Sequence, residues 1–529
     1  MRDKGKPEGA GSRLRAFFFA EHPFFLPAGV VLTVFLITRL PFFIYYPVVG
    51  IGHDTGDYLV LAKAIGSGTL PHFIIRTPGY PLFIWLVTSF CDRWLAVIFV
   101  QNLLTLASSL FIVFAVLRLS PRLALPAALA MCGYVGSSQV LLHDTYTISD
   151  SLYANSLIFT VALLLLALNR SRPLTLLCLS AMMAITILVR PAGMYLVAIY
   201  LFILVYLFLN RFTRAELRCF APPLPIMLLA LCTYNFFTIG EFAISPWGDA
   251  AFVGATILYW EQDPSLPPFV NNALKGLPDS YKKVGLTADD MVTLKTSWNV
   301  ASLSHLYGKS SDPLIHGEGW GFGSRFTGGD FLQNRMYIRQ VSLMAIRRHP
   351  ILYIKYCWAN LVTYWTGIAL NTDFYSAVAV RGSMTYVTKN RGYEKWKAKE
   401  FADSPPPVGV LIGPSGTPQN VTLASTSLSS LHRGWQSLHW KVFQRLFWVW
   451  AYFATFILSV GKLIRSRGRN LGAFILCTLG LTAIGASLVI CLIARSVERY
   501  SYPTQFICYL SVALLPLLWV SKGTRRDAV

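Results

Sequence analysis

Apolar stretches of about 20 residues, separated by short polar loops, dominate the pattern of this chain, and a helix of that length can cross a lipid bilayer. The apolar stretches 78 to 91 and 350 to 370 are ambiguous and fit helices that lie at the membrane surface. The pattern predicts an all-α polytopic membrane protein of about ten transmembrane helices. The predicted spans are 28 to 48, 94 to 117, 123 to 142, 149 to 168, 174 to 189, 193 to 210, 219 to 239, 441 to 464, 471 to 493 and 503 to 520.

Basic residues in the short loops predict the orientation, because cytoplasmic loops of membrane proteins carry an excess of lysine and arginine. With ten spans and a cytoplasmic N-terminus, the short basic loops all fall on the cytoplasmic side, as at Arg118 with Arg122 and at Lys462 through Arg469. Either ambiguous stretch, if it crossed alone, would place several of these loops on the opposite side. We therefore expect a multi-pass protein of the cell (inner) membrane whose first hydrophobic helix is retained rather than cleaved as a signal peptide.

This orientation divides the chain into three regions. The predicted regions are an N-terminal transmembrane module at 1 to 239 with its first outer loop at 49 to 93, an extracytoplasmic loop domain at 240 to 438, and C-terminal transmembrane helices at 439 to 529.

The loop domain is rich in Gly, Pro, Ser, Trp and Lys and has little sustained periodicity. It predicts a small mixed domain with interfacial helices, such as Asp330 to Arg348. Its stretch G-E-G-W-G-F-G-S-R-F-T-G-G lacks the Gly-Lys-Ser/Thr ending of a phosphate-binding loop and favours a flexible loop. The Pro/Ser/Thr/Gly composition of Ser404 to Ser430 is typical of a mobile loop or lid.

Composition agrees with a membrane protein and argues against other classes. Hydrophobic residues make up 54% of the 529 residues and charged residues 13%, with a mean hydropathy of +0.51. The net charge of +21 comes from short basic runs between spans, and no basic helix or aromatic-basic module of a nucleic-acid-binding protein is present. The nine cysteines form no C-x-x-C pair and lie mostly in apolar stretches, so disulfide frameworks and cysteine metal clusters are not expected.

Ionisable residues gather at the predicted outer ends of the spans, where they are costly unless paired or solvated. We expect them to meet in one wet cavity at the outer membrane face. Arg39, inside the first span, needs a carboxylate or phosphate nearby. The residues of the predicted cavity are Asp54, Asp57, Arg76, Asp144, Asp150, Arg190, Arg495, Glu498 and Arg499.

Several of these residues also have a purely structural interpretation. Asp54 and Asp150 each precede a helical pattern, where an aspartate can cap free backbone N–H groups. Asp57, one turn after Asp54, fits a solvated helix face or a helper carboxylate. Arg190 could extend from a helix end to the membrane surface. The histidines show no H-x-x-x-H spacing, so a zinc site is not predicted.

Four short motifs recur in order along these outer segments. Asp54 is followed by Tyr58 and Ala62 in a Y-x-x-x-A pattern, and Arg76 to Leu82 reads R-T-P-G-Y-P-L. The two later motifs are the S-D-S-L at Ser149 to Leu152 and the R-Y-x-x-P of Arg499, Tyr500 and Pro503. Each motif is weak alone, but their order and common side are more specific.

In these motifs the chain resembles the GT-C superfamily of integral-membrane glycosyltransferases, which includes lipid A aminoarabinose transferases and protein O-mannosyltransferases. The resemblance covers about the first 240 residues. It implies an enzyme that transfers a sugar from a polyprenyl-phosphate donor to an acceptor hydroxyl with inversion. The acceptor would be a glycan, a lipid or a protein, and the protein would act as a monomer among membrane lipids.

The resemblance also implies roles for single residues. Asp54 would be the catalytic base that takes the proton of the acceptor hydroxyl. Fixed cations would bind the donor phosphate as it leaves. The residues implied for the phosphate are Arg76, Arg495, Arg499 and Arg190. Those implied as supporting or acceptor-binding residues are Asp57, Tyr58, Asp150 and Tyr500.

A divalent metal is left open by the same resemblance. Asp54 and Asp150 offer oxygen ligands suited to Mg²⁺ or Mn²⁺. Some members place a glutamate before the arginine of the second motif, where this chain has Ile75. Asp150 then lacks that partner, and we expect a reaction without metal.

Two other functions remain open. A polymerase or ligase of surface polysaccharide would use a lipid-diphosphate donor and would concentrate its arginines in one large outer loop. A transporter or flippase of lipid-linked glycans would have broken helices and polar residues near mid-membrane. The predicted spans are apolar at their centres, with exceptions such as Asn102 and Asn235.

Overall fold

The computed structural model describes much of the chain, and the part it describes is helical, with no β-strand among those residues. The described residues are 23–45, 54–69, 71–73, 76–169, 172–210, 212–246, 252–283, 285–303, 305–307, 331–367, 434–435, 437–439, 441–443, 446–493 and 498–519.

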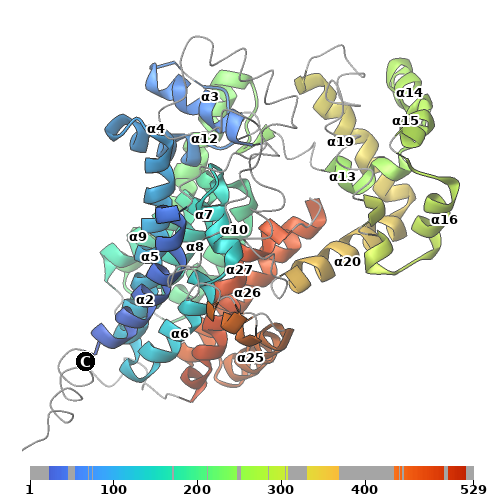
Figure 1. The fold of residues 1–529 in the computed structure, drawn as a ribbon. Helices are drawn as coiled ribbons and strands as arrows, with labels where there is room; N and C mark the ends of the chain where they lie inside the picture. Colours follow the sequence, from blue (N-terminus) through green and yellow to red (C-terminus); the bar gives the residue numbers. More distant parts are fainter. Residues whose placement is uncertain are drawn as a thin grey trace, which may run out of the picture.

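The N-terminal helices form most of a bundle (Figure 1). They are α2 (Phe25–Tyr45), α3 (Thr55–Gly66), α4 (Gly79–Phe90), α5 (Trp94–Leu119), η2 (Pro121–Leu123), α6 (Ala124–Val135), α7 (Ser138–Asp144), α8 (Ser149–Asn169), α9 (Pro173–Val189), η3 (Pro191–Met194), α10 (Tyr195–Leu209), α11 (Arg214–Phe220) and α12 (Pro223–Ile239).

The later helices complete the bundle and form a second unit beside it. The unit beside the bundle contains α13 (Val253–Thr256), η5 (Ile257–Tyr259), α14 (Pro268–Lys275), α15 (Leu277–Lys283), α16 (Ala288–Thr296), α19 (Phe331–Arg348) and α20 (Pro350–Gly367). The bundle is completed by α25 (Leu446–Arg465), α26 (Leu471–Ile493), α27 (Glu498–Ala513) and η6 (Leu515–Leu518).

Seven helical segments of the described chain are long and apolar enough to cross a membrane, so the protein is an all-α polytopic membrane protein. They are Phe25–Ile44, Leu95–Leu119, Ser149–Asn169, Pro191–Leu209, Arg214–Ile239, Leu446–Arg465 and Leu471–Leu492.

The other three predicted spans are less regular than the sequence pattern suggests. α9 is apolar but has only 17 residues. The predicted span 503 to 520 is divided between α27 and η6, and α27 is too polar and too short to meet the same criterion. The predicted span 123 to 142 bends by 64° between α6 and α7, so it is a broken span or a re-entrant loop.

Trp435 packs against the break between α6 and α7. A side chain on Gly136 would have its Cβ 2.3 Å from the Trp435 indole nitrogen, and that nitrogen donates a hydrogen bond to the Gly136 carbonyl over 3.1 Å. The indole therefore packs directly against the backbone at the bend, where only a glycine leaves room for it. The carbonyl freed by the bend still has a donor, as irregular backbone at membrane depth requires.

A second hydrophobic core lies in the helices from α13 to α20, with the buried side chains Trp260, Tyr307, Val341 and Tyr356. Figure 1 shows these helices beside the bundle, with α20 leading toward α26 and α27. The Tyr353 hydroxyl donates to the Leu492 carbonyl over 2.7 Å and joins the two parts.

The region predicted as a mixed domain is helical where the structure describes it, so its strand content is not supported there. The predicted surface helix from Asp330 to Arg348 corresponds to α19, which begins at Phe331. The ambiguous stretches 78 to 91 and 350 to 370 correspond to α4 and α20. The Gly-rich stretch and residues Ser404 to Ser430 lie outside the described residues.

Candidate functional site

Helices α3 and α4 form a hairpin at one end of the bundle (top of Figure 1). Asp54 occupies the N-cap position of α3, but its side chain makes no capping hydrogen bond. Its Oδ1 instead accepts from Arg76 Nη2 over 2.6 Å. The capping interpretation of the Asp54 carboxylate is therefore not supported, because the side chain is directed to Arg76, in the segment that connects α3 to α4.

Arg76 binds a second carboxylate with a different nitrogen. Its Nε donates to Asp57 Oδ2 over 3.0 Å. The Asp57 side chain is 44% exposed, whereas that of Asp54 is 16% exposed. Asp57 thus faces solvent, and Asp54 is the more enclosed of the two acids. Two carboxylates and one guanidinium leave this cluster with a net negative charge.

Tyr58 packs its buried ring beneath the cluster of Asp54, Asp57 and Arg76. The Arg76 guanidinium lies over its ring, 5.3 Å from the centroid. Burial raises the pKa of the Tyr58 phenol, with Arg76 opposing the shift. Burial would lower the pKa of Arg76, but its neighbours Tyr58, Asp54 and Asp57 outweigh burial and leave that pKa above its ordinary value. Arg76 is therefore a permanent cation that its neighbours hold in place.

Two hydrogen bonds attach α3 to the segment that precedes and begins α8. The Thr55 hydroxyl donates to the Thr147 carbonyl over 2.8 Å. The hydroxyls of Tyr58 and Ser149 lie 2.7 Å apart. The position of Asp54 is therefore set by the segment from Thr147 to Ser149 as well as by its own helix.

The R-T-P-G-Y-P-L motif has a packing explanation. A Cβ on Gly79 would lie 2.7 Å from both the Leu188 carbonyl oxygen and the Val189 nitrogen, so only glycine allows α4 to begin against the end of α9. Tyr80 follows and packs edge-on against Tyr58, with ring centroids 4.8 Å apart. The motif thus brings Arg76 close to the element that carries Arg190.

Asp150 and Arg190 form a second ion pair, which is more enclosed than the first. Asp150 lies in the first turn of α8, not before it, and its side chain is 1% exposed. Arg190 directly follows α9 and its guanidinium contacts Asp150 instead of extending to the surface. Arg190 also lies near enough to Tyr58 to oppose the rise in that phenol's pKa. The two ion pairs therefore flank the same tyrosine.

The structure thus brings six of the candidate side chains together, from α3, the turn before α4, α8 and the end of α9. They are Asp54, Asp57, Tyr58, Arg76, Asp150 and Arg190.

Other candidates are placed elsewhere or are not described. Asp144 lies apart from this group, buried against Arg39 at 2.9 Å, so Arg39 has the carboxylate partner that its position in the first span requires. Arg495 lies outside the described residues. Arg499 and Tyr500, with Glu498, lie in the first turn of α27, but the structure does not describe their side chains.

Three contact residues were not among the predicted site residues. Ser149 and Thr147 hold α3 by a hydroxyl and a carbonyl. Tyr502, two residues after Tyr500, stacks on His143 with ring centroids 4.2 Å apart and so brings the start of α27 to α7. The position of Tyr502 within the R-Y-x-x-P motif could have pointed to it from the sequence. The contact of the Thr147 carbonyl could not be found in this way, because every residue type has a backbone carbonyl.

The described carboxylates do not form a ligand set for Mg²⁺ or Mn²⁺. Asp54 contacts Arg76, and Asp150 contacts Arg190, so a cation at either would compete with a guanidinium. Among the residues that the structure describes, no three His, Cys, Asp or Glu side chains gather in a way that could hold an ion.

Comparisons with protein-family models, curated proteins and solved structures found no match to this chain. The functional proposal therefore depends on the residues and contacts described above.

Proposed function

We propose that this protein is a GT-C type glycosyltransferase that moves a sugar from a polyprenyl-phosphate donor to an acceptor hydroxyl at the extracytoplasmic membrane face. The observation that carries the proposal is the contact between Asp54 and Arg76 at one end of a bundle of membrane helices, where Asp54 Oδ1 lies 2.6 Å from Arg76 Nη2. An enclosed carboxylate beside a permanent cation supplies a proton acceptor and an anion-binding group within one site.

The reaction assigns one bond change to each group. The acceptor oxygen attacks the anomeric carbon of the sugar and forms the new C–O bond. The bond from that carbon to the phosphate oxygen breaks on the opposite face, so the configuration is inverted. Asp54 takes the acceptor proton. The leaving phosphate keeps the bonding electrons and needs charge stabilisation rather than a proton.

Arg76 has N–H groups left for the leaving phosphate beyond those that contact the two acids. A guanidinium has five N–H donors, and the contacts to Asp54 and Asp57 need one each. A donor phosphate that draws Arg76 toward itself loosens its hold on Asp54 and leaves that carboxylate able to accept the acceptor proton. Donor binding and base activation are thereby coupled.

The ion pair of Asp150 and Arg190 supports the same site through Tyr58. Arg190 adds positive charge beside Tyr58, and Asp150 fixes the position of that guanidinium. In the proposal Arg495 and Arg499 complete the phosphate clamp, and Tyr500 and Asp150 support the acceptor. The positive-inside pattern of the short loops is the reason to assign the site to the outer face.

The test uses the full-length protein in liposomes with undecaprenyl phosphate carrying mannose, aminoarabinose or galacturonate, and a cell-envelope extract as acceptor source. The expected result is release of undecaprenyl phosphate with at least one of these donors. Asp289→Asn, which removes an exposed acid from the first turn of α16, is the control that keeps wild-type turnover.

Two outcomes of the same experiment contradict the proposal. If the protein uses an undecaprenyl-diphosphate oligosaccharide as donor and uses none of the monophosphate donors, it is a polymerase or ligase. Movement of the labelled lipid between leaflets without cleavage would identify a flippase.

A further inference from the structure

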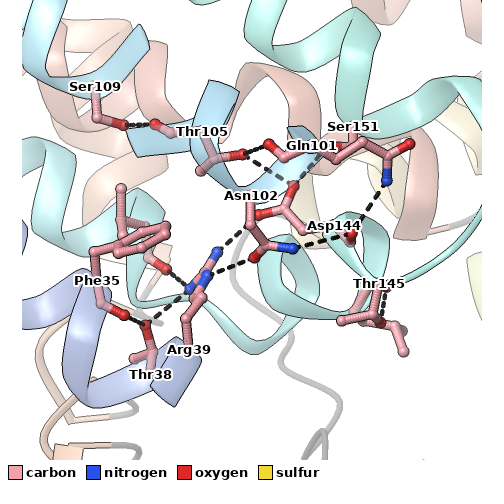
Figure 2. A network of polar contacts seen from close by, with 12 residues as sticks. Phe35, Thr38, Arg39, Gln101, Asn102, Thr105, Ser109, Asp144, Thr145 and Ser151 are labelled. Atoms are coloured by element: carbon pink, nitrogen blue, oxygen red, sulfur yellow. Dashed lines mark hydrogen bonds and ion pairs between the residues drawn. The ribbon is translucent and has the colours of Figure 1, made fainter. Parts of the chain in front are cut away.

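An ion pair more completely buried than that of Asp54 and Arg76 joins Arg39 in α2 to Asp144 at the end of α7 (Figure 2). Arg39 Nη2 is 2.9 Å from Asp144 Oδ2, and the two side chains are 1% and 2% exposed. Charges removed from water in this way are tolerated only with complete hydrogen bonding. The functional proposal gives this pair no role.

The Arg39 guanidinium joins three elements. Nη1 donates to the Thr38 hydroxyl over 2.9 Å and to the carbonyl of Val135, the last residue of α6. Nε donates to Asn102 Oδ1 of α5 over 3.3 Å. One side chain thus satisfies a carbonyl at the break between α6 and α7 and ties that break to α2 and α5.

The Asp144 carboxylate continues the network into α5 and α8. Its Oδ1 accepts from the hydroxyls of Thr105 over 3.0 Å and Ser151 over 2.6 Å. Gln101 Nε2 donates to the backbone carbonyls of Asp144 over 3.1 Å and of Tyr146 over 3.0 Å. The chain from Asp144 to Ser151 is therefore fixed at both ends and near its middle, as Figure 2 shows around Asp144.

This segment is the one that attaches α3. Between its fixed ends lie the Thr147 carbonyl and the Ser149 hydroxyl, which contact Thr55 and Tyr58. Thr55 directly follows Asp54. The Arg76 guanidinium, which binds Asp54, lies over the ring of Tyr58. A continuous chain of contacts therefore runs from the buried pair to the proposed base.

We propose that Arg39 and Asp144 are positioning residues, which hold the segment from Asp144 to Ser151 in the shape that places Asp54 against Arg76. As a role in catalysis this rests on the proposed function, but the structural coupling can be measured without it. The alternative is a pair needed only for folding, in which case a folded variant without the pair keeps α3 and turnover unchanged.

The test removes the charges but keeps hydrogen-bonding groups, in the double variant Arg39→Gln with Asp144→Asn. Hydrogen exchange measured by mass spectrometry is expected to rise at least tenfold in α3 amides while α26 stays unchanged. Tyr452→Phe is the matched control and is expected to leave exchange in α3 unchanged. It removes another buried hydrogen bond between helices, from the Tyr452 hydroxyl to the Gly480 carbonyl over 2.6 Å, and both residues are far from α3 in the sequence. Unchanged exchange in α3 of the folded double variant would overturn the proposal.

Kinetics add a measurement that a purely structural role would not move. With an undecaprenyl-phosphate sugar as donor, the double variant is expected to lose at least tenfold in kcat with KM within twofold. Adding Tyr58→Phe is expected to cost little more, because both changes break the same chain of contacts. Independent, multiplying losses would contradict the coupling.

Two further outcomes remain decisive. If the double variant does not fold, Ser151→Ala replaces it and is expected to raise exchange in α3 to a smaller extent; no rise would overturn the proposal. If wild-type protein uses no undecaprenyl-phosphate donor while exchange in α3 rises in the variant, the functional proposal fails and the positioning of α3 by the pair stands.

Discussion

Gly79 and Val189 approach so closely that a Cβ atom on Gly79 would lie 2.7 Å from the Val189 nitrogen. This approach places the start of α4, and with it Arg76, next to the chain that continues into Arg190. The contact is between backbones, so neither side can yield by rotating a side chain.

Gly79→Ala is therefore expected to displace α4 and disrupt the site without changing any charge. We expect turnover to fall at least about tenfold and stability to fall by about 1–3 kcal/mol, which is typical of overpacking. Gly29→Ala in α2 is the matched control, because the added Cβ would meet no atom within 4 Å beyond its own stretch of helix, and helix stability there should rise slightly. Equal turnover of the two variants in liposomes would contradict this account of the motif.

Arg76→Lys tests whether the fork of the guanidinium matters as well as its charge. Lysine keeps the cation but presents one nitrogen, so it cannot reproduce the separate contacts of Nε to Asp57 and Nη2 to Asp54. We expect kcat to fall about 10²-fold, a loss typical of removing a group that stabilises developing charge. Steady-state kinetics with the donor measure this. A lysine variant with wild-type kcat would show that only the net charge is needed.

Removal of divalent metal is expected to leave transfer unchanged. Each carboxylate that could bind a cation already contacts an arginine, Asp54 with Arg76 and Asp150 with Arg190. Transfer is measured before and after dialysis against EDTA, and again after addition of Mg²⁺ or Mn²⁺. Activity that is lost with EDTA and restored by either ion would contradict the prediction and would require the ion pairs to open.

His439 makes the stability of the bundle depend on pH. Its Nε2 lies 2.7 Å from the Gly133 carbonyl, and burial lowers the pKa of His439 from 6.5 to about 4. The unfolded chain therefore binds the proton first as pH falls, so stability is complete above about pH 6.5 and declines toward pH 4, by up to about 3 kcal/mol.

Thermal unfolding in detergent between pH 7 and pH 4 measures this decline. His439→Gln keeps a donor for the Gly133 carbonyl but does not titrate, so its stability should depend less steeply on pH. Trp435→Phe, which removes the hydrogen bond to the Gly136 carbonyl at the bend between α6 and α7 without removing a titrating group, is the control and should keep the wild-type slope. The same slope in wild type and in His439→Gln would contradict the prediction.

Local properties of the sequence were sufficient for much of the fold. A helix that crosses a membrane is specified by its own length and apolar composition, and seven of the ten predicted spans met that criterion. The break between α6 and α7 falls at Gly136, Ser137 and Ser138, a Gly/Ser signal for a helix bend that the span prediction of 123 to 142 did not use. The indole that fills the bend comes from Trp435, about 300 residues later in the chain.

Part of the candidate site could likewise be predicted from nearby sequence, and part depended on how distant helices pack. Asp54 and Arg76 lie before and after the single helix α3, so their proximity followed from a short stretch of sequence. An aspartate before a helix fits both a cap and a catalytic acid. The neighbouring residues favoured chemistry for Asp54, and its side chain contacts Arg76 instead of capping α3. Arg39 predicted a partner but could not identify Asp144, because that choice depends on how α2 packs against α7.

The central claim, that Asp54 is the base, is tested most directly by the kcat of Asp54→Asn with an undecaprenyl-phosphate sugar, compared with Asp57→Asn. Both variants remove one negative charge from the Arg76 cluster and keep the shape of the side chain. The account predicts that Asp54→Asn loses about 10²–10⁴-fold in kcat at unchanged protein level and donor affinity, and that Asp57→Asn loses far less. A kcat for Asp54→Asn equal to that of Asp57→Asn or of wild type would contradict it.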